Sequence, residues 1–299
     1  MTSSEGRVYS PVAALVMAGA PNDGPLKEAD DAPYEALIRI GGRPMIEYVL
    51  DVLRAAPSVG AVGVVGPAGL RGHVRQDELL IEPGGAMLDN LERGARALQA
   101  AGHTGHLLVV TSDIPLVTVE ALELFLQRCR ERRASAPPDA PEPDAYYPMV
   151  RRETSEARFP GVRRTYVGLR DGQFTGGNFV LLNPDMVLER RYLFDRVVAL
   201  RKDPLGMARI LGLGFIVNFL LRRLSAGDIE RIVREKLGIH GAVIEVPHAE
   251  VGFDVDKPSD LALVRRPALL EHPAAAGGIP RRVGRDQRRR SRDLAGRLL

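Results

Sequence analysis

The feature of this sequence that most constrains its fold is the regular alternation of short apolar runs with amphipathic segments in its first half. The runs "VAALVMA" (12–18), "VGAVGVVG" (59–66) and "HLLVVTSD" (106–113) fit strands that are buried on both faces. Between them, "RPMIEYVLDVLRAA" and "GGAMLDNLERGARALQAA" each place their apolar residues on one helical face. This alternation predicts an α/β fold with three layers, in which helices cover both faces of a mainly parallel sheet.

The second half of the chain departs from that rhythm. "RASAPPDAPEPDAYYP" (133–148) is too rich in proline for a helix and predicts an exposed connection. "RRTYVGLRDGQFTGGNFVLLNPD" then indicates paired strands with glycine-bearing turns, and residues 186–238 indicate a helical insertion. "AVIEV" (242–246) returns to a strand. We therefore expect a single domain over residues 10–265, followed by a basic tail at 266–299.

One helical stretch, "ILGLGFIVNFLL" (210–221), is apolar all round. It is shorter than the roughly 18 apolar residues that a membrane-spanning helix needs, and Gly212 and Gly214 would weaken a helix lying on a membrane surface. We expect the apolar helix over 205–224 to be buried in the core or to form a homodimer interface. With no spanning segment and no basic leader before an apolar stretch, the sequence predicts a cytoplasmic protein.

The basic character of the chain is local. Its formal net charge is +3, but residues 281–299 contain eight Arg and two Asp, so that the remainder is net −3. A short Arg-rich end without aromatic residues is typical of a solvated terminus. We expect no specific nucleic-acid partner.

A glycine-bearing loop, "VMAGAPNDGPLK" (16–27), follows the first predicted strand. Gly19 and Gly24 have the spacing of the two P-loop glycines, but Pro25 and Leu26 stand where that motif requires Lys and then Ser or Thr. The loop also lacks the G-x-G-x-x-G pattern of dinucleotide-binding folds. Its own residues leave a phosphate-binding loop and an ordinary turn both open.

Carboxylates follow two other predicted strands. Asp113 ends an apolar strand in "TSDIPL", and Thr118 is better placed than Asp113 to cap the next helix. In "DVDKPSD", Asp254 and Asp256 are alternate residues, which face the same way in an extended chain. Mg²⁺ prefers one or two carboxylates together with phosphate oxygens and water, so we expect these three residues to bind Mg²⁺ or Mn²⁺. The alternative for the second group is a turn before a helix.

Four segments in this order, "LVMAGA…PYEALIRIGGRPMIEYVLDVL", "PGGAMLDNLERG", "LLVVTSDIPLV" and "VGFDVDKPSDLALV", resemble the nucleotidyltransferases of the molybdenum cofactor guanylyltransferase type. The resemblance covers residues 12–126 and 242–264, with "TGGNFVLLNPD" between them. It implies a Rossmann-like, GT-A-like sheet, a glycine-rich nucleotide loop from Gly19 to Lys27, and a magnesium site.

In such an enzyme, an acceptor phosphate attacks the α-phosphorus of a nucleoside triphosphate and pyrophosphate leaves. The protein chiefly has to position two anions and neutralise their charge. We expect Lys27 and Asp113 to be catalytic and GTP or CTP to be the favoured substrate, with a phosphorylated small molecule as acceptor. The residues expected to contact the nucleotide are Ala18, Gly19, Ala20, Gly24, Lys27, Gly84, Gly85 and Asn90; those expected at the acceptor are Glu35, Thr175, Gly176 and Asn178. Alternatively, Gly84 and Gly85 simply start a helix, and "FTGGN" (174–178) is a tight hairpin turn.

The loop departs from the family pattern, which reads roughly L-A-G-G-x-G-x-R-M and is followed by a second cation. Here Ala20 replaces a glycine, no Arg occurs between Gly19 and Lys27, and Glu35 stands in the place of the second cation. Lys27 can serve as a point charge for phosphate. Glu35 would orient Lys27, coordinate a metal or bind an acceptor hydroxyl, or it marks a loss of catalysis.

Two other functions therefore stay open. The D-x-D shape of "DVD" is shared with nucleotide-sugar glycosyltransferases of GT-A type, although in those the motif follows a middle strand. Glu35 and the missing Arg would suit a non-catalytic nucleotide-binding homologue.

Overall fold

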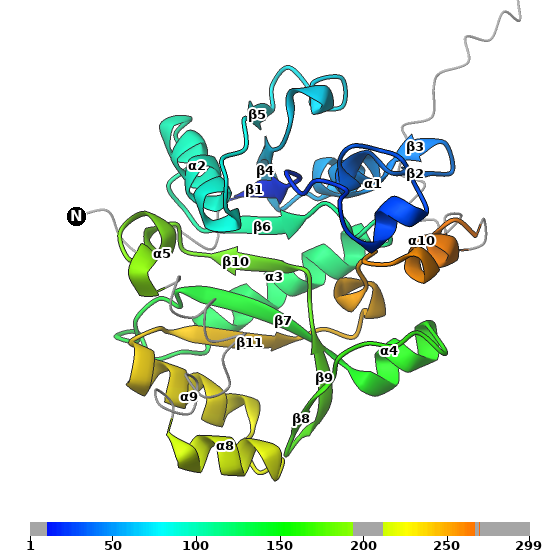
Figure 1. Cartoon of the computed structure of the whole chain (residues 1–299). Coiled ribbons are helices and arrows are strands. Elements are labelled where there is room, and N and C mark those ends of the chain that lie inside the picture. Colours follow the sequence, from blue (N-terminus) through cyan, green and yellow to red (C-terminus); the bar gives the residue numbers. More distant parts are fainter. Residues whose placement is uncertain (1–10, 194–211, 267–268, 270–299) are drawn as a thin grey trace, which may run out of the picture.

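A mixed sheet of nine strands forms the centre of the computed structural model, which describes residues 11–193, 212–266 and 269 (Figure 1). The strand order is β5-β4-β1-β6-β10-β7-β9-β8, and β11 also pairs with β7. The strands are β1 (Val12–Met17), β4 (Val59–Val65), β5 (Leu79–Ile81), β6 (Leu107–Thr111), β7 (Ala145–Arg151), β8 (Val167–Leu169), β9 (Gly172–Gly176), β10 (Phe179–Leu182) and β11 (Gly241–Glu245). A separate small ribbon joins β2 (Arg39–Ile40) to β3 (Arg43–Pro44).

The first half of the sheet is parallel, as predicted. β1 lies between β4 and β6 and is parallel to both, and β5 continues the parallel order beyond β4. The second half is mixed, because β10 pairs antiparallel with both β6 and β7. β8 and β9 form an antiparallel hairpin whose turn includes Gly172, with a φ of +142° that favours glycine.

Helices cover both faces of this sheet. β1 is buried on both sides, so Val12, Ala14 and Val16 pack in one core cluster and Ala13 and Leu15 in another. The first cluster includes the apolar faces of α1 (Met45–Ala55) and α3 (Val119–Ala134). The second includes those of α2 (Met87–Ala100), α5 (Asp185–Leu188) and the end of α9 (Ala226–Leu237). The three-layer arrangement predicted from the alternating pattern is confirmed.

A third core cluster lies under the loops at one end of the sheet. It joins Leu26, Ile38 and Met45 to residues from the other half of the chain, among them Phe159 and Phe253. The rings of Phe159 and Phe253 are 4.5 Å apart between centroids. Two short helices frame this cluster, α4 (Arg152–Arg158) and α10 (Pro258–Val264). The cluster therefore connects the loop after β1 to the segment that carries Asp254 and Asp256.

The expectations for the second half are met in part. β7 begins at Ala145, inside the stretch expected to be an exposed connection over 133–148, because Tyr146 packs in the core. Of the predicted insertion at 186–238, α8 (Leu213–Leu220) and α9 are helical, and residues 194–211 lie outside the described part. The same holds for 205–211 of the apolar helix and for almost all of the basic tail. Within the described ranges, no helix combines the length and the hydropathy needed to cross a membrane.

Candidate active site

The candidate site lies where the parallel strands reach their carboxyl ends. The loop 18–24 follows β1, residues 82–86 follow β5, and residues 112–117 follow β6. Because these strands are parallel, all three loops leave the sheet at the same edge, where α/β folds bind their ligands. Thr118 caps α3 by accepting a hydrogen bond from the backbone N–H of Ala121 at 3.1 Å, as predicted, so Asp113 is not the cap of that helix.

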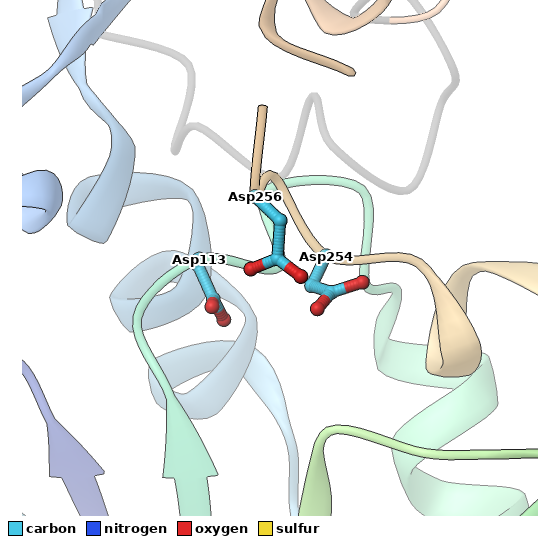
Figure 2. A group of neighbouring side chains, drawn as sticks. All are labelled: Asp113, Asp254 and Asp256. Atoms are coloured by element: carbon cyan, nitrogen blue, oxygen red, sulfur yellow. The ribbon is translucent and has the colours of Figure 1, made fainter. Parts of the chain in front are cut away.

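Asp113, Asp254 and Asp256 converge at this edge, as Figure 2 shows. One carboxylate oxygen from each lies within 4.8 Å of the others. The segment that carries Asp254 and Asp256 is fastened to the end of β6, because the N–H of Val255 donates to the carbonyl of Asp113 at 2.9 Å. The side chain of Val255 is buried, whereas the carboxylates of Asp254 and Asp256 lie next to each other and close to that of Asp113. The alternation inferred from "DVD" is thus the geometry observed.

Burial, and then the charges of neighbouring carboxylates, raise the pKa values of Asp113 and Asp256. Burial is the largest cause for Asp113, whose pKa is raised to about 6, and the charges of Asp254 and Glu35 add to it. For Asp256, burial and then the neighbouring Asp254 raise the pKa to about 7. Like charges held this close disfavour joint ionisation unless a cation lies between them. A bound cation would therefore stabilise the ionised form of the cluster.

A divalent metal ion fits this donor set. Oδ1 of Asp113 is buried and has no hydrogen-bond partner among the described residues, although a carboxylate oxygen in that position ordinarily has one. Carboxylate oxygens are the hard ligands that Mg²⁺ and Mn²⁺ prefer. Asp113, Asp254 and Asp256 could hold such an ion, as predicted.

Two glycine-bearing loops meet beside the strand ends. A Cβ atom on Gly19 would come within 3.2 Å of Cβ of Pro83 and 3.4 Å of Nδ2 of Asn90, so the loops approach closely at this glycine. Oδ1 of Asn90 accepts a hydrogen bond from the N–H of Gly84 and fixes the second loop. The helix α2 starts only at Met87. The alternative that Gly84 and Gly85 start this helix is therefore wrong, and Asn90 takes the N–H of Gly84; their contact with a nucleotide stays a prediction.

The loop after β1 leaves backbone donors available. Within the described residues, the N–H groups of Gly19, Ala20 and Gly24 make no hydrogen bond. The loop is held instead by Asn22, whose Nδ2 donates to the carbonyls of Asp30 and Ala32 at 2.8 and 2.9 Å. Several N–H groups in a glycine-bearing turn at a strand end form a concavity suited to anions. This geometry accommodates both readings of the loop, a turn and a phosphate cradle.

Lys27 and Glu35 occupy different surroundings. Nζ of Lys27 pairs with the carboxylate of Asp31 at 3.3 Å and the side chain is 49% exposed, so it does not join the carboxylate cluster. Glu35 interacts with the charge of the cluster. Burial raises the pKa of Glu35, and the charges of Asp256 and Asp23 raise it further. Of the two, Glu35 is the residue whose charge interacts with the cluster, through Asp113 and Asp256.

The residues expected to border the acceptor have clear structural contacts. β9 and β10 pair with other strands and not with each other, so the hairpin alternative for 174–178 is wrong. Asn178 joins β6 to the C-terminal segment: its carbonyl accepts from Thr111 N–H, and its N–H donates to the carbonyl of Val251, both at 3.1 Å. Thr175 is buried, and a Cβ on Gly176 would collide with Oη of Tyr147. None of these contacts assigns a ligand.

Sequence reasoning missed Arg164. Its Nη1 is hydrogen-bonded to Oδ1 of Asp254, its Nη2 donates to the carbonyl of Asp254 at 2.8 Å, and its Cζ lies 4.3 Å from the ring centroid of Phe253. The side chain is only 10% exposed. Arg164 lies in the irregular segment between α4 and β8, where no periodicity marks it, so only the folded chain brings it to the cluster.

Known proteins share this architecture. The family model described as "MobA-like NTP transferase domain" matches residues 34–211. The solved structure of a hypothetical transferase from Thermus thermophilus is 38% identical with a TM-score of 0.70, covering 84% of this chain and 99% of that one. A comparison with curated proteins finds no match.

Two more distant structures share the fold alone. CMP:2-keto-3-deoxy-manno-octonic acid synthetase, in complex with CTP, is 15% identical with a TM-score of 0.54, covering 86% of this chain and 97% of that one. The 4-diphosphocytidyl-2C-methyl-D-erythritol synthase of Anaerococcus prevotii is 10% identical with a TM-score of 0.53, covering 90% and 100%.

The matched range of the family includes Asp113, whereas the loop after β1 and the segment of Asp254 and Asp256 lie on either side of it. That boundary agrees with the divergence of the loop from the family pattern, since Ala20, which replaces a glycine, lies outside the matched range; Glu35, which replaces a cation, lies inside it. With a mostly parallel α/β sheet, the loops at its carboxyl edge and a family match across the central part of the chain, the chain belongs to the MobA-like NTP transferase family.

Proposed function

We propose that this protein transfers a nucleoside monophosphate from a nucleoside triphosphate to a phosphorylated small molecule and releases pyrophosphate, in a reaction that depends on Mg²⁺ or Mn²⁺. The observation that carries this proposal is the convergence of Asp113, Asp254 and Asp256 at the strand ends, beside the loop after β1 with its available backbone N–H groups. In the reaction, an acceptor phosphate oxygen forms a bond to the α-phosphorus, while the bond from that phosphorus to the oxygen bridging to the β-phosphorus breaks. The bridging oxygen leaves with pyrophosphate.

The chain's own groups would divide this task. Asp113, Asp254 and Asp256 would hold the divalent ion, which neutralises charge on the reacting phosphates when bound. The free N–H groups of Gly19, Ala20 and Gly24 would donate to phosphate oxygens. Lys27 would leave Asp31 for the triphosphate, an exchange that costs little because its present ion pair is exposed.

CTP is the nucleotide that we propose first. The related fold of the CMP:2-keto-3-deoxy-manno-octonic acid synthetase was determined with CTP, which supports a cytidine nucleotide for this sheet. GTP is the second choice, from the resemblance to guanylyltransferases. At the acceptor we keep Glu35, which the fold couples to the cluster, together with Thr175, Gly176 and Asn178 from the neighbouring strand end.

Two other expectations stay predictions. Val217, Leu220 and Leu221 of the α8 region are more than half exposed, as an unpaired homodimer face would be. Cytoplasmic location is likewise a prediction. Sedimentation of the purified full chain would decide the first.

The function is tested by titrating the full chain with CTP, GTP, ATP and UTP in the presence of Mg²⁺. Release of pyrophosphate is then followed with a panel of phosphorylated small molecules. We expect CTP or GTP to bind and Asp113→Asn to abolish pyrophosphate release without unfolding the protein. If none of the four nucleotides binds, the proposed function is wrong; preferential binding of a nucleoside diphosphate sugar would point to the glycosyltransferase alternative.

A further inference from the structure

Three contacts hold the guanidinium of Arg164 in place. Both terminal nitrogens of its guanidinium bind Asp254, one through the carboxylate and one through the backbone carbonyl. Its Cζ lies over the ring of Phe253, 4.3 Å from the centroid, and Phe253 is itself buried among the apolar residues under the site. With two hydrogen bonds and a cation–π contact, Arg164 is a fixed charge and not a surface side chain that samples many rotamers.

The charge of Arg164 has a clear electrostatic setting. Within the described ranges, no other Lys or Arg forms an ion pair with Asp113, Asp254 or Asp256. The guanidinium therefore offsets one of three crowded negative charges, at the same cluster that suits a divalent cation. Two cations at one carboxylate group repel each other, and water screens this repulsion only in part, because the side chains of Arg164 and Asp254 are 10% and 21% exposed. If the guanidinium stays beside Asp254, it repels the metal ion. If it leaves, its two hydrogen bonds to Asp254 are lost. Either way Arg164 weakens binding of the metal ion.

We infer that Arg164 is a built-in counter-ion that opposes binding of a divalent metal ion at Asp113, Asp254 and Asp256 until a nucleotide is present. Arg164 is thus a positioning residue, and this inference rests on the proposed function, since it takes a nucleoside triphosphate as the second ligand. The triphosphate carries enough negative charge to neutralise both the metal ion and the guanidinium. Nε of Arg164 is buried without a hydrogen-bond partner among the described residues, so the group retains a donor that none of its present contacts uses.

The inference predicts a specific order of affinities for metal alone. Metal-free, nucleotide-free protein is titrated with Mn²⁺, and binding is followed by the electron paramagnetic resonance signal of the free ion. We expect Arg164→Gln, which removes the charge but keeps a hydrogen-bond donor, to bind Mn²⁺ about tenfold more tightly than the natural protein. A tenfold change corresponds to about 1.4 kcal/mol. Arg164→Lys, which keeps the charge, should stay within about twofold of the natural protein.

Arg163→Gln is the matched control, since Arg163 is an exposed neighbour on the same segment and the substitution removes the same charge. It should leave the affinity for Mn²⁺ within about twofold of the natural value. If Arg164→Gln binds Mn²⁺ equally or more weakly, or if Arg164→Lys binds as tightly as Arg164→Gln, the counter-ion role is refuted. Circular dichroism checks the fold, and Arg164→Met serves as a second neutral variant if the Gln variant does not fold.

A second titration addresses the nucleotide. CTP should strengthen Mn²⁺ binding to the natural protein by a larger factor than it strengthens binding to Arg164→Gln, because the variant has already lost the opposing charge. Equal factors would refute the nucleotide dependence. The titrations without nucleotide stay informative even if the protein does not turn over CTP, so failure of the proposed function and failure of this inference are distinguishable.

Discussion

Replacing Asp113 by Asn should stabilise the metal-free protein. The fold raises the pKa of this carboxyl from 3.8 to about 6, chiefly by burial and then through the charges of Asp254 and Glu35. A carboxyl with a raised pKa binds its proton more tightly in the folded chain than in the unfolded one. The folded state therefore loses stability as the pH rises from about 4 through about 6. Because one pKa unit corresponds to about 1.4 kcal/mol, the full penalty above pH 7 is about 3 kcal/mol.

The free energy of unfolding is measured by urea denaturation of the metal-free natural protein and of Asp113→Asn. At pH 8 the variant should be more stable by about 2–3 kcal/mol, since the neutral amide carries no ionisation penalty. At pH 5 the advantage should fall to roughly half, because much of the natural Asp113 is then protonated in the folded chain. Addition of Mg²⁺ should stabilise the natural protein and not the variant.

Asp139→Asn is the control, because Asp139 is exposed in the segment after α3 and makes no contact with the cluster. It should show no advantage that depends on pH. An Asp113→Asn variant that is less stable than the natural protein at pH 8, or more stable by the same amount at both pH values, would refute the account of Asp113 as a buried carboxyl that is costly to ionise.

Three further substitutions test the loop, the electrostatics and the packing. Lys27→Ala should lower kcat/KM for the nucleotide by about tenfold to a hundredfold, because one charge-assisted hydrogen bond is lost. The control Lys236→Ala, on the exposed surface of α9, should not lower it. Unchanged turnover of the Lys27 variant would contradict the proposed role of the loop. Glu35→Gln removes a like charge beside the cluster, so the acidic limb of a pH profile of Mn²⁺ binding should move to lower pH; movement to higher pH would be inconsistent with repulsion. Gly94→Ala would place a methyl group 2.5 Å from both δ-carbons of Leu15, so thermal denaturation should report a loss of about 1–3 kcal/mol despite the better helix propensity; a gain would show that this contact relaxes freely.

The parts of the fold that depend on local patterns could be predicted from the sequence. β1 and β6 appear as uninterrupted apolar runs because both of their faces are buried, and α2 displays its buried face as a helical period. The capping role of Thr118 follows from its side chain and its place before α3. The proximity of Asp113 and Asp254 could be predicted, because their places after predicted strands and the resemblance to a family both indicated a metal site at the carboxyl edge of the sheet.

The remainder depends on contacts between distant segments, which leave no local pattern. The antiparallel entry of β10 between β6 and β7 is set by pairing across the sheet, and its apolar residues would suit either direction. The start of α2 at Met87, beyond Gly84 and Gly85, could not be predicted, because the hydrogen bond from Gly84 to the side chain of Asn90 forms only in the folded loop. Arg164 could not be found because its surrounding residues, in an irregular segment, give no reason to prefer it over Arg163.

The hydrogen bond from Val255 to Asp113 has a consequence for the order of folding. Asp113 is synthesised early, with the parallel half of the sheet, while Asp254 and Asp256 follow β11, its last described strand in chain order. A domain generally folds as a unit during synthesis from the N-terminus. The three carboxylates can therefore come together only after the segment beyond β11 has been synthesised. Completion of the site is thus tied to completion of nearly the whole described sheet.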